Sequence, residues 1–292
     1  MQPSPEDDPA TLVSTDWLAR HLSDPDLRIL DASWHLDPER DPRAEYEAGH
    51  IPGARFVPMG EVSDARSDLP HMAPAPEKFA SRMRRLGVGD GHQVVVYDAA
   101  GLFSAARLWW LFRLMGVERA AVLDGGLPKW RAEGRPLDDL PPVARERHLT
   151  VRFRNDLVRD VTQVAASSKL GDRTIVDARS PSRFAGEEEE PRAGLRAGHV
   201  PGSRNLHYAR LLAADGTMKP PAALRRAFEE AGVDLSRPVV TTCGSGVTAA
   251  ILSLALERIG HRDHALYDGS WSEWGAYGDL AVETGPAREP AE

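Results

Sequence analysis

The chain has 292 residues, of which 41% are hydrophobic, and its formal net charge is −8. This length suggests about two domains, and the acidic balance argues against a protein that binds nucleic acid or an anionic membrane surface. No segment approaches the ~20 apolar residues of a membrane-spanning helix. The first eight residues lack the apolar core of a signal peptide, so we expect a cytoplasmic protein.

The predicted elements alternate between helix and strand. In the first half we expect a helix over 17–22, a strand over 28–31, a turn over 48–54 that leads into a strand, a helix over 76–86, a strand over 94–97, a helix over 104–115 and a strand over 121–123. The second half repeats this order, with helices around 164–167, 222–231 and 247–259, strands over 174–177, 238–242 and 265–267, and a turn over 197–203. Such alternation predicts a parallel sheet covered by helices on both faces.

The two halves also share sequence. Four segments of the first half recur in the second, in the same order and at a near-constant offset of roughly 145 residues. The matched segments are 29–33 with 175–179, 48–54 with 197–203, 94–98 with 239–243, and 124–130 with 268–274. We therefore predict a tandem duplication, with α/β domains over 10–136 and 158–285 and a linker over 137–157.

One difference between the halves matters for chemistry. The last strand before the long helix leads to Cys243 in the second half and to Asp98 in the first. Cys243 is the only cysteine, so the chain forms no internal disulfide and holds no Cys-rich zinc site. Because a carboxylate has no sulfur chemistry, we expect the first domain to be non-catalytic and the second to be catalytic.

Cys243 is followed by Gly-Ser-Gly and then by a helix former rich in Ala, Leu and Ile. This predicts a thiol at the end of a strand, a tight loop and the start of a helix. Glycine allows a loop to curl with its amides pointing inward. These amides and the positive end of the helix dipole favour an anion, so we expect a reactive thiolate. The alternative is a buried structural cysteine.

The duplication, the turns at 50–53 and 199–202, and the loop CGSGVT at 243–248 together resemble the tandem rhodanese-type sulfurtransferases, over about residues 12–284. The loop is similar to that of 3-mercaptopyruvate sulfurtransferases, whereas thiosulfate-preferring rhodaneses usually carry a basic loop of the form CRKGVT. The resemblance implies two rhodanese-like domains, each with a five-stranded parallel sheet flanked by helices, and a persulfide intermediate on Cys243.

In this family two arginines hold the carboxylate of the substrate. The matching pattern here, from Asp177 to Arg192, assigns that role to Arg183 and Arg192. A guanidinium group can bind a carboxylate through two hydrogen bonds, which lysine cannot do. The alternative is that these arginines lie on the surface and pair with the acidic run Glu187–Glu190.

The loop after Cys243 is expected to stabilise the thiolate and then the persulfide through its amides. Ser245 is a candidate for hydrogen bonding the substrate carbonyl or relaying a proton, and the alternative is that it caps the following helix. The other loop residues with a predicted substrate-binding role are Gly244, Gly246, Val247 and Thr248.

His50 and His199 precede the Pro-Gly turns of the two halves. Because the histidine occurs in both the active and the inactive half, a structural hydrogen bond is the favoured interpretation, and catalysis by His50 is kept as an alternative. Asp177 is expected to orient backbone or an arginine in preference to acid–base catalysis.

The resemblance implies an enzyme that moves sulfane sulfur from 3-mercaptopyruvate to a thiol or cyanide through a Cys243 persulfide and releases pyruvate. The expected partners are a small-molecule sulfur donor and a thiol acceptor, such as thioredoxin or a low-molecular-weight thiol. No metal or organic cofactor is required. A neutral loop suits a keto acid with one carboxylate, whereas a thiosulfate dianion would gain more from cationic loop side chains.

Three alternatives remain beside this function. The first is a thiosulfate:cyanide sulfurtransferase, and the second is a non-enzymatic module that carries a persulfide or senses thiols. The third is a cysteine-dependent phosphatase, which needs an arginine six residues after the cysteine. Ala249 occupies that position, which disfavours the phosphatase.

Overall fold

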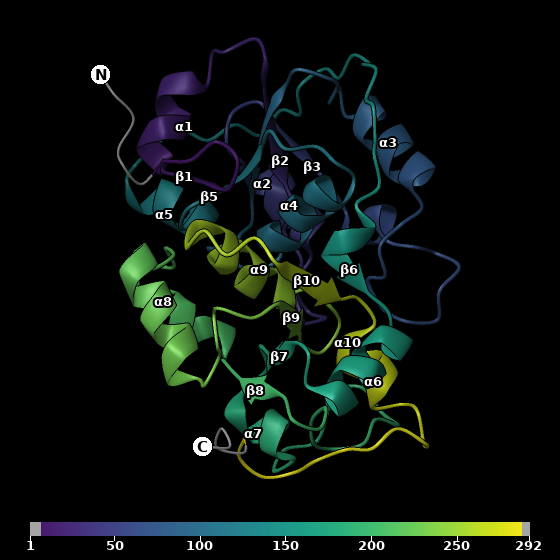
Figure 1. Ribbon diagram of the computed structural model, residues 1–292. Helices are drawn as coiled ribbons and strands as arrows, with labels where there is room; N and C mark the ends of the chain where they lie inside the picture. Colours follow the sequence, from purple (N-terminus) through teal and green to yellow (C-terminus); the bar gives the residue numbers. More distant parts are fainter. Residues whose placement is uncertain (1–6, 288–292) are drawn as a thin grey trace. The chain divides into compact units, whose positions relative to one another are not determined.

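The computed structural model describes residues 7–287, which form two compact units (Figure 1). The first comprises the residues up to Arg66, Ala73–Arg154 and Ala213–Met218. The second comprises Ser67–Met72, Asn155–Leu212 and the residues from Lys219 onward. Each unit therefore includes a short segment from the other half of the chain, which the sequence repeat did not predict.

The first unit is built on a five-stranded sheet in the order β1-β5-β4-β2-β3, and all of its strand pairs are parallel. Its strands are β1 (Leu12–Val13), β2 (Leu27–Asp31), β3 (Ala54–Phe56), β4 (Gln93–Tyr97) and β5 (Ala120–Leu123). Its helices are α1 (Thr15–His21), α2 (Pro42–Ala48), α3 (Pro76–Arg85), α4 (Ala105–Leu114) and α5 (Gly126–Ala132), with a 3₁₀ turn over Met59–Val62.

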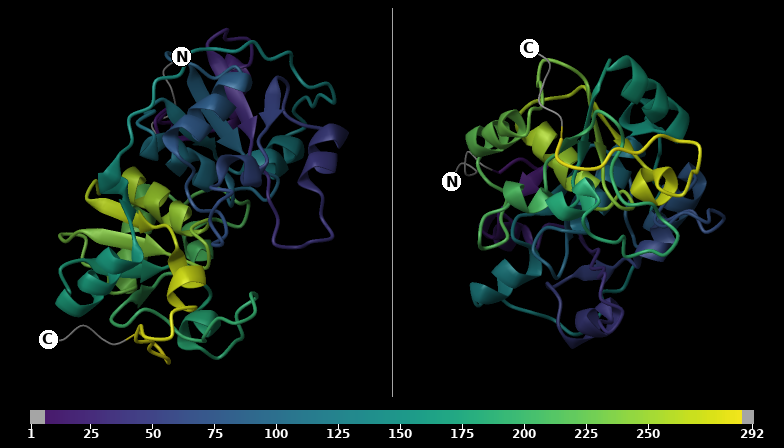
Figure 2. Two further views of the ribbon diagram at one scale, coloured as in Figure 1. Left: turned by 90° about the vertical axis from the view of Figure 1, so that its right-hand side faces the viewer. Right: turned by 90° about the horizontal axis from the view of Figure 1, so that it is seen from below.

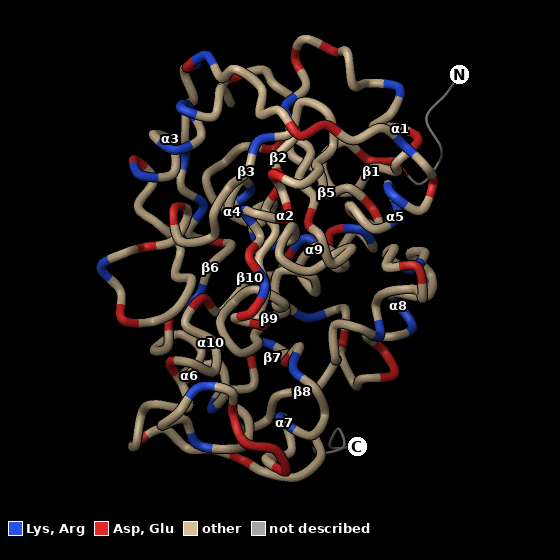
Figure 3. Tube along the Cα trace, turned by 180° about the vertical axis from the view of Figure 1, so that it is seen from behind, with Lys and Arg blue, Asp and Glu red and all other residues tan. Residues whose placement is uncertain are grey.

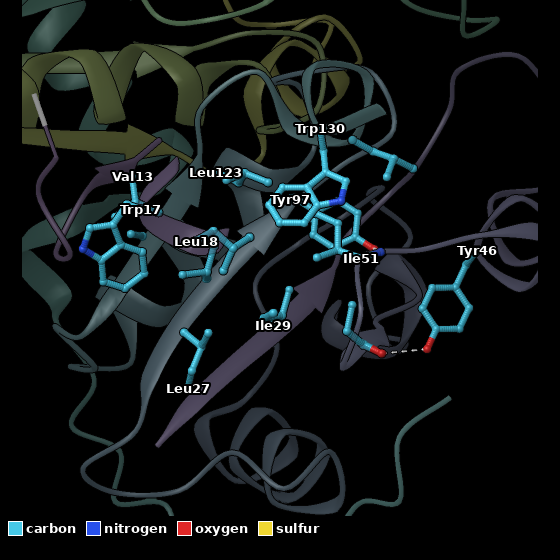
Figure 4. Packing of buried hydrophobic residues seen from close by; sticks show 14 of the residues in the cluster. Val13, Trp17, Leu18, Leu27, Ile29, Tyr46, Ile51, Tyr97, Leu123 and Trp130 are labelled. Atoms are coloured by element: carbon cyan, nitrogen blue, oxygen red, sulfur yellow. Dashed lines mark hydrogen bonds between the residues drawn. The ribbon is translucent and has the colours of Figure 1, made fainter. Parts of the chain in front are cut away.

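The core of the first unit shows why the sheet needs helices on both faces. Every side chain of β4 is buried, so both faces of this strand must be covered. Val95 and Tyr97 pack with Trp17 of α1 and Trp130 of α5 on one face (Figure 4). On the other face α4 packs against β4 and β5, and its Phe112 meets Phe79 of α3 edge to face at 5.1 Å.

The second unit repeats this architecture, with the strand order β6-β10-β9-β7-β8 and parallel pairing throughout. Its strands are β6 (Val158–Arg159), β7 (Thr174–Asp177), β8 (Arg204–Asn205), β9 (Val239–Thr242) and β10 (His264–Tyr267). Its helices are α6 (Val161–Leu170), α7 (Pro181–Ala185), α8 (Pro221–Glu230), α9 (Ala249–Arg258) and α10 (Ser270–Trp274), with 3₁₀ turns over Asn155–Leu157 and Tyr208–Leu211. As in the first unit, helices lie on both sides of the sheet (Figure 2).

The predicted element order is observed, and the predicted ends shift by a few residues. Ser14 caps α1 by accepting a hydrogen bond from the Trp17 amide at 3.1 Å. Asp160, one of the two residues that the sequence offers as the start of this helix, forms a reciprocal capping box with Gln163, and α6 begins at Val161. The short edge strands β1 and β6 and the short helices α2, α5, α7 and α10 were not predicted, because two to seven residues carry too little periodicity.

The predicted linker over 137–157 is largely ordered against the first unit. The Asp90 amide donates to the His148 carbonyl at 2.8 Å, and the Arg152 amide donates to the Met115 carbonyl at 2.8 Å. Thr150 donates to both carboxylate oxygens of Asp90. The unit boundary therefore falls between Arg154 and Asn155 and not within a free linker, because backbone hydrogen bonds fix a segment whose Pro and charged residues suggest a loop.

None of the helices in the described residues has the length and apolar character that would let it cross a membrane.

The strands β2 and β7 both end in a buried aspartate, but the two aspartates have different partners. Asp177 forms a salt bridge with Arg179, with Oδ2 and a terminal guanidinium nitrogen 2.6 Å apart and both side chains 1% exposed. Asp31 accepts a hydrogen bond from the Ser33 amide at 2.9 Å, and within residues 7–287 no arginine pairs with it. Burial raises the pKa of Asp31, and the hydrogen bonds from Ser33 only partly oppose this.

We expect Asp31→Asn and Asp177→Asn to differ in their effect on stability. Because the folded pKa of Asp31 lies above its unfolded value, the stability that this carboxyl contributes is present below about pH 4 and is lost as the pH rises through the folded pKa. Asp31→Asn therefore gains stability relative to wild type as the pH rises. Asp177→Asn breaks a buried ion pair and costs about 3 kcal/mol at neutral pH.

Both effects on the free energy of unfolding can be measured by urea unfolding followed by hydrogen–deuterium exchange. Peptides from β2 and β7 are analysed separately, between about pH 5 and 8. A deficit of Asp31→Asn that widens with pH would contradict the expectation.

Candidate active site

Cys243 lies directly after β9, at the carboxyl edge of the second sheet. β9 is flanked by β10 on one side and β7 on the other. The chain leaves β7 toward β8 and leaves β9 in the opposite direction toward β10, so the topology reverses between β7 and β9. Ligands of open parallel sheets bind at such reversals, beyond the carboxyl ends of the strands. The Cys243 side chain is a free thiol in a residue that is 2% exposed.

The start of α10 holds the loop after Cys243 in place. The Cys243 amide donates to Ser270 Oγ at 3.3 Å, and the Cys243 carbonyl accepts from the Trp271 amide at 2.9 Å. The Gly244 carbonyl accepts from both the amide and the hydroxyl of Ser272, at 2.9 and 2.6 Å. Gly246 has a φ of 77°, which only glycine adopts without strain. The loop is thus fixed from outside and curled by its second glycine.

Several backbone N–H groups of this loop donate no hydrogen bond within the described part of the protein. Among the described residues, the N–H groups of Gly244, Ser245, Val247 and Thr248 donate to no backbone or side-chain acceptor. α9 begins at Ala249, so these amides lie at the positive end of the helix dipole. A group of unused amides at a helix start can stabilise a negative charge.

In the first unit, the amides of the matching loop bind a carboxylate. Asp98, at the position of Cys243, is fully buried. Its carboxylate accepts hydrogen bonds from the amides of Ala100, Phe103 and Ala105, at 2.9, 2.7 and 2.8 Å. Its carbonyl accepts from the Leu127 amide at 3.0 Å, as the Cys243 carbonyl does from Trp271. The duplicated loop is therefore an anion cradle in the copy that lacks sulfur.

Both predicted arginines converge on the Cys243 loop. A Cβ atom placed on Gly244 would lie 3.2 Å from a terminal nitrogen of Arg183. A terminal nitrogen of Arg192 lies 3.5 Å from Ser272 Oγ, the hydroxyl that also holds the Gly244 carbonyl. Burial lowers the pKa of Arg192, the nearby Cys243 opposes this change, and the nearby Arg183 adds to it. The three side chains thus share one electrostatic environment.

A buried ionic chain sets the position of Arg183. Glu190 bridges two arginines, with Oε1 2.6 Å from Arg179 and Oε2 2.5 Å from Arg183. Arg179 in turn pairs with Asp177 and stacks over Trp271, 4.4 Å from the ring centroid. Burial alone would lower the pKa of Arg179, but Asp177 and Glu190 outweigh it, so the pKa is raised. Asp177 therefore orients an arginine, and no acid–base role follows from its contacts.

The acidic run after α7 divides into an outer and an inner part. Glu187, Glu188 and Glu189 are exposed, whereas the Glu190 side chain is 1% exposed. The run forms the red stretch beside α7 in Figure 3. Arg183 does pair with the acidic run, as the alternative expected, but the pair is not a surface one, since its partner is buried and its own side chain is 18% exposed. Arg192 pairs with no carboxylate in the described part of the chain.

Ser245 is buried, and its hydroxyl makes no hydrogen bond within residues 7–287. The residue that precedes α9 is Thr248, and its side chain makes no capping hydrogen bond either. Capping of α9 by Ser245 has no support in these contacts.

The two turn histidines occupy equivalent structural positions. His50 Nδ1 lies 2.9 Å from the Tyr46 carbonyl, and the ring stacks on Tyr46. His199 Nδ1 lies 2.7 Å from the Phe184 carbonyl, and the ring stacks on Phe184. Among residues 7–287, no group of three or more His, Cys, Asp or Glu side chains is placed to hold a metal ion.

Sequence reasoning missed three residues that shape the site. Arg179 and Glu190 lie within the segment from Asp177 to Arg192 that matches the family pattern. Nothing in the sequence distinguished Glu190 from the three exposed glutamates before it. Ser272, which contacts both Arg192 and Gly244, carried no signal, because serines near the end of a chain are common.

Comparison with known proteins places this geometry in a family. A family model described as the rhodanese-like domain matches residues 14–133 and 160–277. The 3-mercaptopyruvate sulfurtransferase of Escherichia coli is 42% identical over 273 residues, covering 93% of this chain and 97% of that protein. The thiosulfate/3-mercaptopyruvate sulfurtransferase 1 of Arabidopsis thaliana, described as mitochondrial, is 40% identical over 295 residues, covering 94% of this chain and 78% of that one.

A solved structure agrees. The crystal structure of SseA from Escherichia coli superposes with a TM-score of 0.82 at 40% identity, over 90% of this chain and 99% of that chain. The two sheets, the two domain matches and the near-complete coverage lead to one conclusion. The protein belongs to the rhodanese family of sulfurtransferases and carries two rhodanese-like domains in tandem.

Proposed function

We propose that this protein transfers sulfane sulfur from 3-mercaptopyruvate to a thiol or cyanide through a persulfide on Cys243. The observation that carries the proposal is the convergence of Arg183 and Arg192 on a cysteine loop with unused amides. The arginines bind the substrate carboxylate, and the amides hold the charge on sulfur. The anion that Asp98 places in the matching loop supports this role for the amides.

The reaction has two half-reactions. The Cys243 thiolate attacks the sulfur of 3-mercaptopyruvate and forms an S–S bond. The carbon–sulfur bond breaks, and its electron pair enters the adjacent ketone as an enolate, which takes up a proton to give pyruvate. An acceptor thiolate or cyanide then attacks the outer sulfur and regenerates the Cys243 thiolate. The covalent intermediate divides one transfer into two easier steps.

The charge balance of the site favours a donor with one negative charge. The loop amides hold the charge on the Cys243 sulfur. Among the remaining charged side chains, Arg179, Arg183 and Arg192 face the carboxylates of Asp177 and Glu190, so three positive groups and two negative groups leave one positive charge for the donor. A keto acid with one carboxylate matches this balance, and a thiosulfate dianion exceeds it. Thiosulfate is the second candidate donor, because the Arabidopsis relative is named for both.

The remaining assignments belong to the same proposal. Ser245 is a buried residue whose hydroxyl makes no hydrogen bond within residues 7–287, and this hydroxyl hydrogen bonds the substrate carbonyl or relays the proton to the enolate. Gly246, Val247 and Thr248 complete the amide cradle. The acceptor is a low-molecular-weight thiol or the thiol of a protein such as thioredoxin. A catalytic role for His50 and a cytoplasmic location stay predictions.

Replacing the nucleophile tests the first half-reaction. Because a hydroxyl is a far weaker nucleophile than a thiolate, Cys243→Ser should lower pyruvate release from 3-mercaptopyruvate by about 10⁴-fold or more. In a single turnover without acceptor, mass spectrometry should find one added sulfur atom on wild-type Cys243 and none on the variant. Pyruvate release that survives the substitution would refute the covalent mechanism. A wild type that is persulfidated by a protein partner but turns over neither small donor would favour a carrier module.

Replacing the arginines tests carboxylate binding. Arg183→Gln and Arg192→Gln each remove charged hydrogen bonds, so each should raise KM for 3-mercaptopyruvate by about tenfold or more. Arg210→Gln is the matched control, because Arg210 lies in the same unit and forms an exposed salt bridge with Glu230. Equal KM values for all three variants would argue against the assignment.

Removing the buried carboxylate tests the choice of donor. Glu190→Gln leaves one more positive charge at the site, so the ratio of kcat/KM for thiosulfate to kcat/KM for 3-mercaptopyruvate should rise, by roughly tenfold. Glu189→Gln, in the exposed part of the same run, should leave the ratio unchanged. Steady-state kinetics with both donors measures the ratio. A folded Glu190→Gln protein with the wild-type ratio would refute the charge argument, and a wild type that prefers thiosulfate would refute the choice of donor.

A further inference from the structure

A second cationic site lies in the first unit, beside the paired strands β2 and β3. A cavity of about 150 Å³ is lined by Arg28, Arg55, Gly87, Val143, Arg145 and Arg147. Arg28 is the second residue of β2 and Arg55 the middle residue of β3, and these two strands are paired. Gly87 follows α3. The cavity thus combines two neighbouring strands, a helix end and the segment that joins the two halves of the chain.

The joining segment is held in place, so the two arginines that it contributes have a defined position. The Arg145 carbonyl would lie 3.1 Å from a Cβ on Gly87. The Arg147 Cβ would lie 2.5 Å from a Cβ on Gly89. The hydrogen bond from the Asp90 amide to the His148 carbonyl fixes the next residue. The glycines after α3 therefore let the backbone of this segment approach closely.

No carboxylate lines this cavity or forms an ion pair with its arginines in residues 7–287, and Asp26 offsets their charge only in part. None of its six lining residues is acidic. Within residues 7–287, none of the four arginines forms a salt bridge with Asp or Glu. Glu146 lies between two of them in sequence but does not line the cavity. Arg28 repels both Arg55 and Arg147, which costs stability unless an anion lies between them.

The pKa shifts of Arg28, Arg55 and His92 agree with mutual repulsion among the arginines of this cavity. Burial lowers the pKa of Arg28, and Arg147 lowers it further, while Asp26 opposes them. Burial lowers the pKa of Arg55, and Arg28 lowers it further. Burial and then Arg28 also lower the pKa of the adjacent His92.

Arg55 supplies an independent observation. Its Nε is buried and has no hydrogen-bond partner. A buried donor without an acceptor is costly, and in native proteins it usually marks a missing water, ion or ligand. Arg28 differs, because backbone carbonyls of Pro25, Leu27 and Gly87 accept from it. Arg28 therefore supplies charge, whereas Arg55 supplies charge and an unused donor.

We propose that this cavity binds a small tetrahedral oxyanion with two negative charges, of the sulfate or phosphate type. Its volume is below the ~300–1,000 Å³ of clefts for drug-sized ligands, so the ligand is an inorganic ion or a terminal group of that size. Guanidinium groups match the oxygen geometry of such ions and bind them through paired hydrogen bonds. This site is separate from the Cys243 loop and does not depend on the proposed function.

Arginine modification on the unaltered chain tests the proposal with residue resolution. The protein is treated with phenylglyoxal in sodium sulfate, sodium phosphate or sodium chloride at one ionic strength, so that screening is equal, and each arginine is followed by peptide mass spectrometry. In sulfate or phosphate, modification of Arg55, Arg145 and Arg147 should slow severalfold compared with chloride. Exposed Arg20, on α1 of the same unit, should react equally in all three salts.

A variant then tests whether the arginines act together. Arg145→Gln changes an exposed side chain, so the fold should be retained, and the sulfate or phosphate needed to protect Arg55 should rise by about tenfold. Arg20→Gln should leave that concentration unchanged. The salt that protects at the lower concentration identifies the anion. If the three arginines react as fast in sulfate and phosphate as in chloride, or if Arg145→Gln leaves the anion concentration that protects Arg55 unchanged, the proposal is wrong.

Discussion

The candidate site depends on one buried carboxylate that lies between two guanidinium groups. Glu190 pairs with Arg179 on one side and Arg183 on the other, and Arg179 is itself held by Asp177 and the Trp271 ring. None of the ions in such a chain is stable alone away from water, since an unpaired buried charge costs several kcal/mol. The requirement that every member be paired therefore fixes where Arg183 points, and it points at Gly244.

The two units carry equivalent loops after β4 and β9, which begin with Asp98 in the first unit and with Cys243 in the second. In the first unit the loop amides hold the Asp98 carboxylate, and the strand beside it ends in Asp31, which has no arginine partner. In the second unit the loop holds a thiol, and the matching aspartate anchors the ionic chain. The amide cradle is therefore a property of the duplicated fold. Arg183 and Arg192, which converge on the Cys243 loop, belong to the second copy.

Charge is handled differently at the two arginine-rich sites. Around Cys243, two carboxylates reduce three guanidinium groups to one positive charge, which suits a ligand with a single negative charge. In the cavity between β2, β3 and the joining segment, four guanidinium groups have no carboxylate among the lining residues. Arginine side chains thus form a network of ion pairs in one place and an unpaired positive cluster in the other, and the difference lies in the partners.

The sequence by itself determined the duplication, the α/β class and the position of the nucleophile. These features rest on local signals: repeated segments, strand and helix patterning, and one cysteine before Gly-Ser-Gly. The pattern match also pointed to Arg183 and Arg192. Only the tertiary structure decided that Glu190 turns inward while its three neighbours stay exposed. It also decided that Ser272 clamps the loop and that the expected linker packs on the first unit. These outcomes depend on contacts between residues up to 60 positions apart, as between Thr150 and Asp90, and local sequence patterns do not show which distant groups meet.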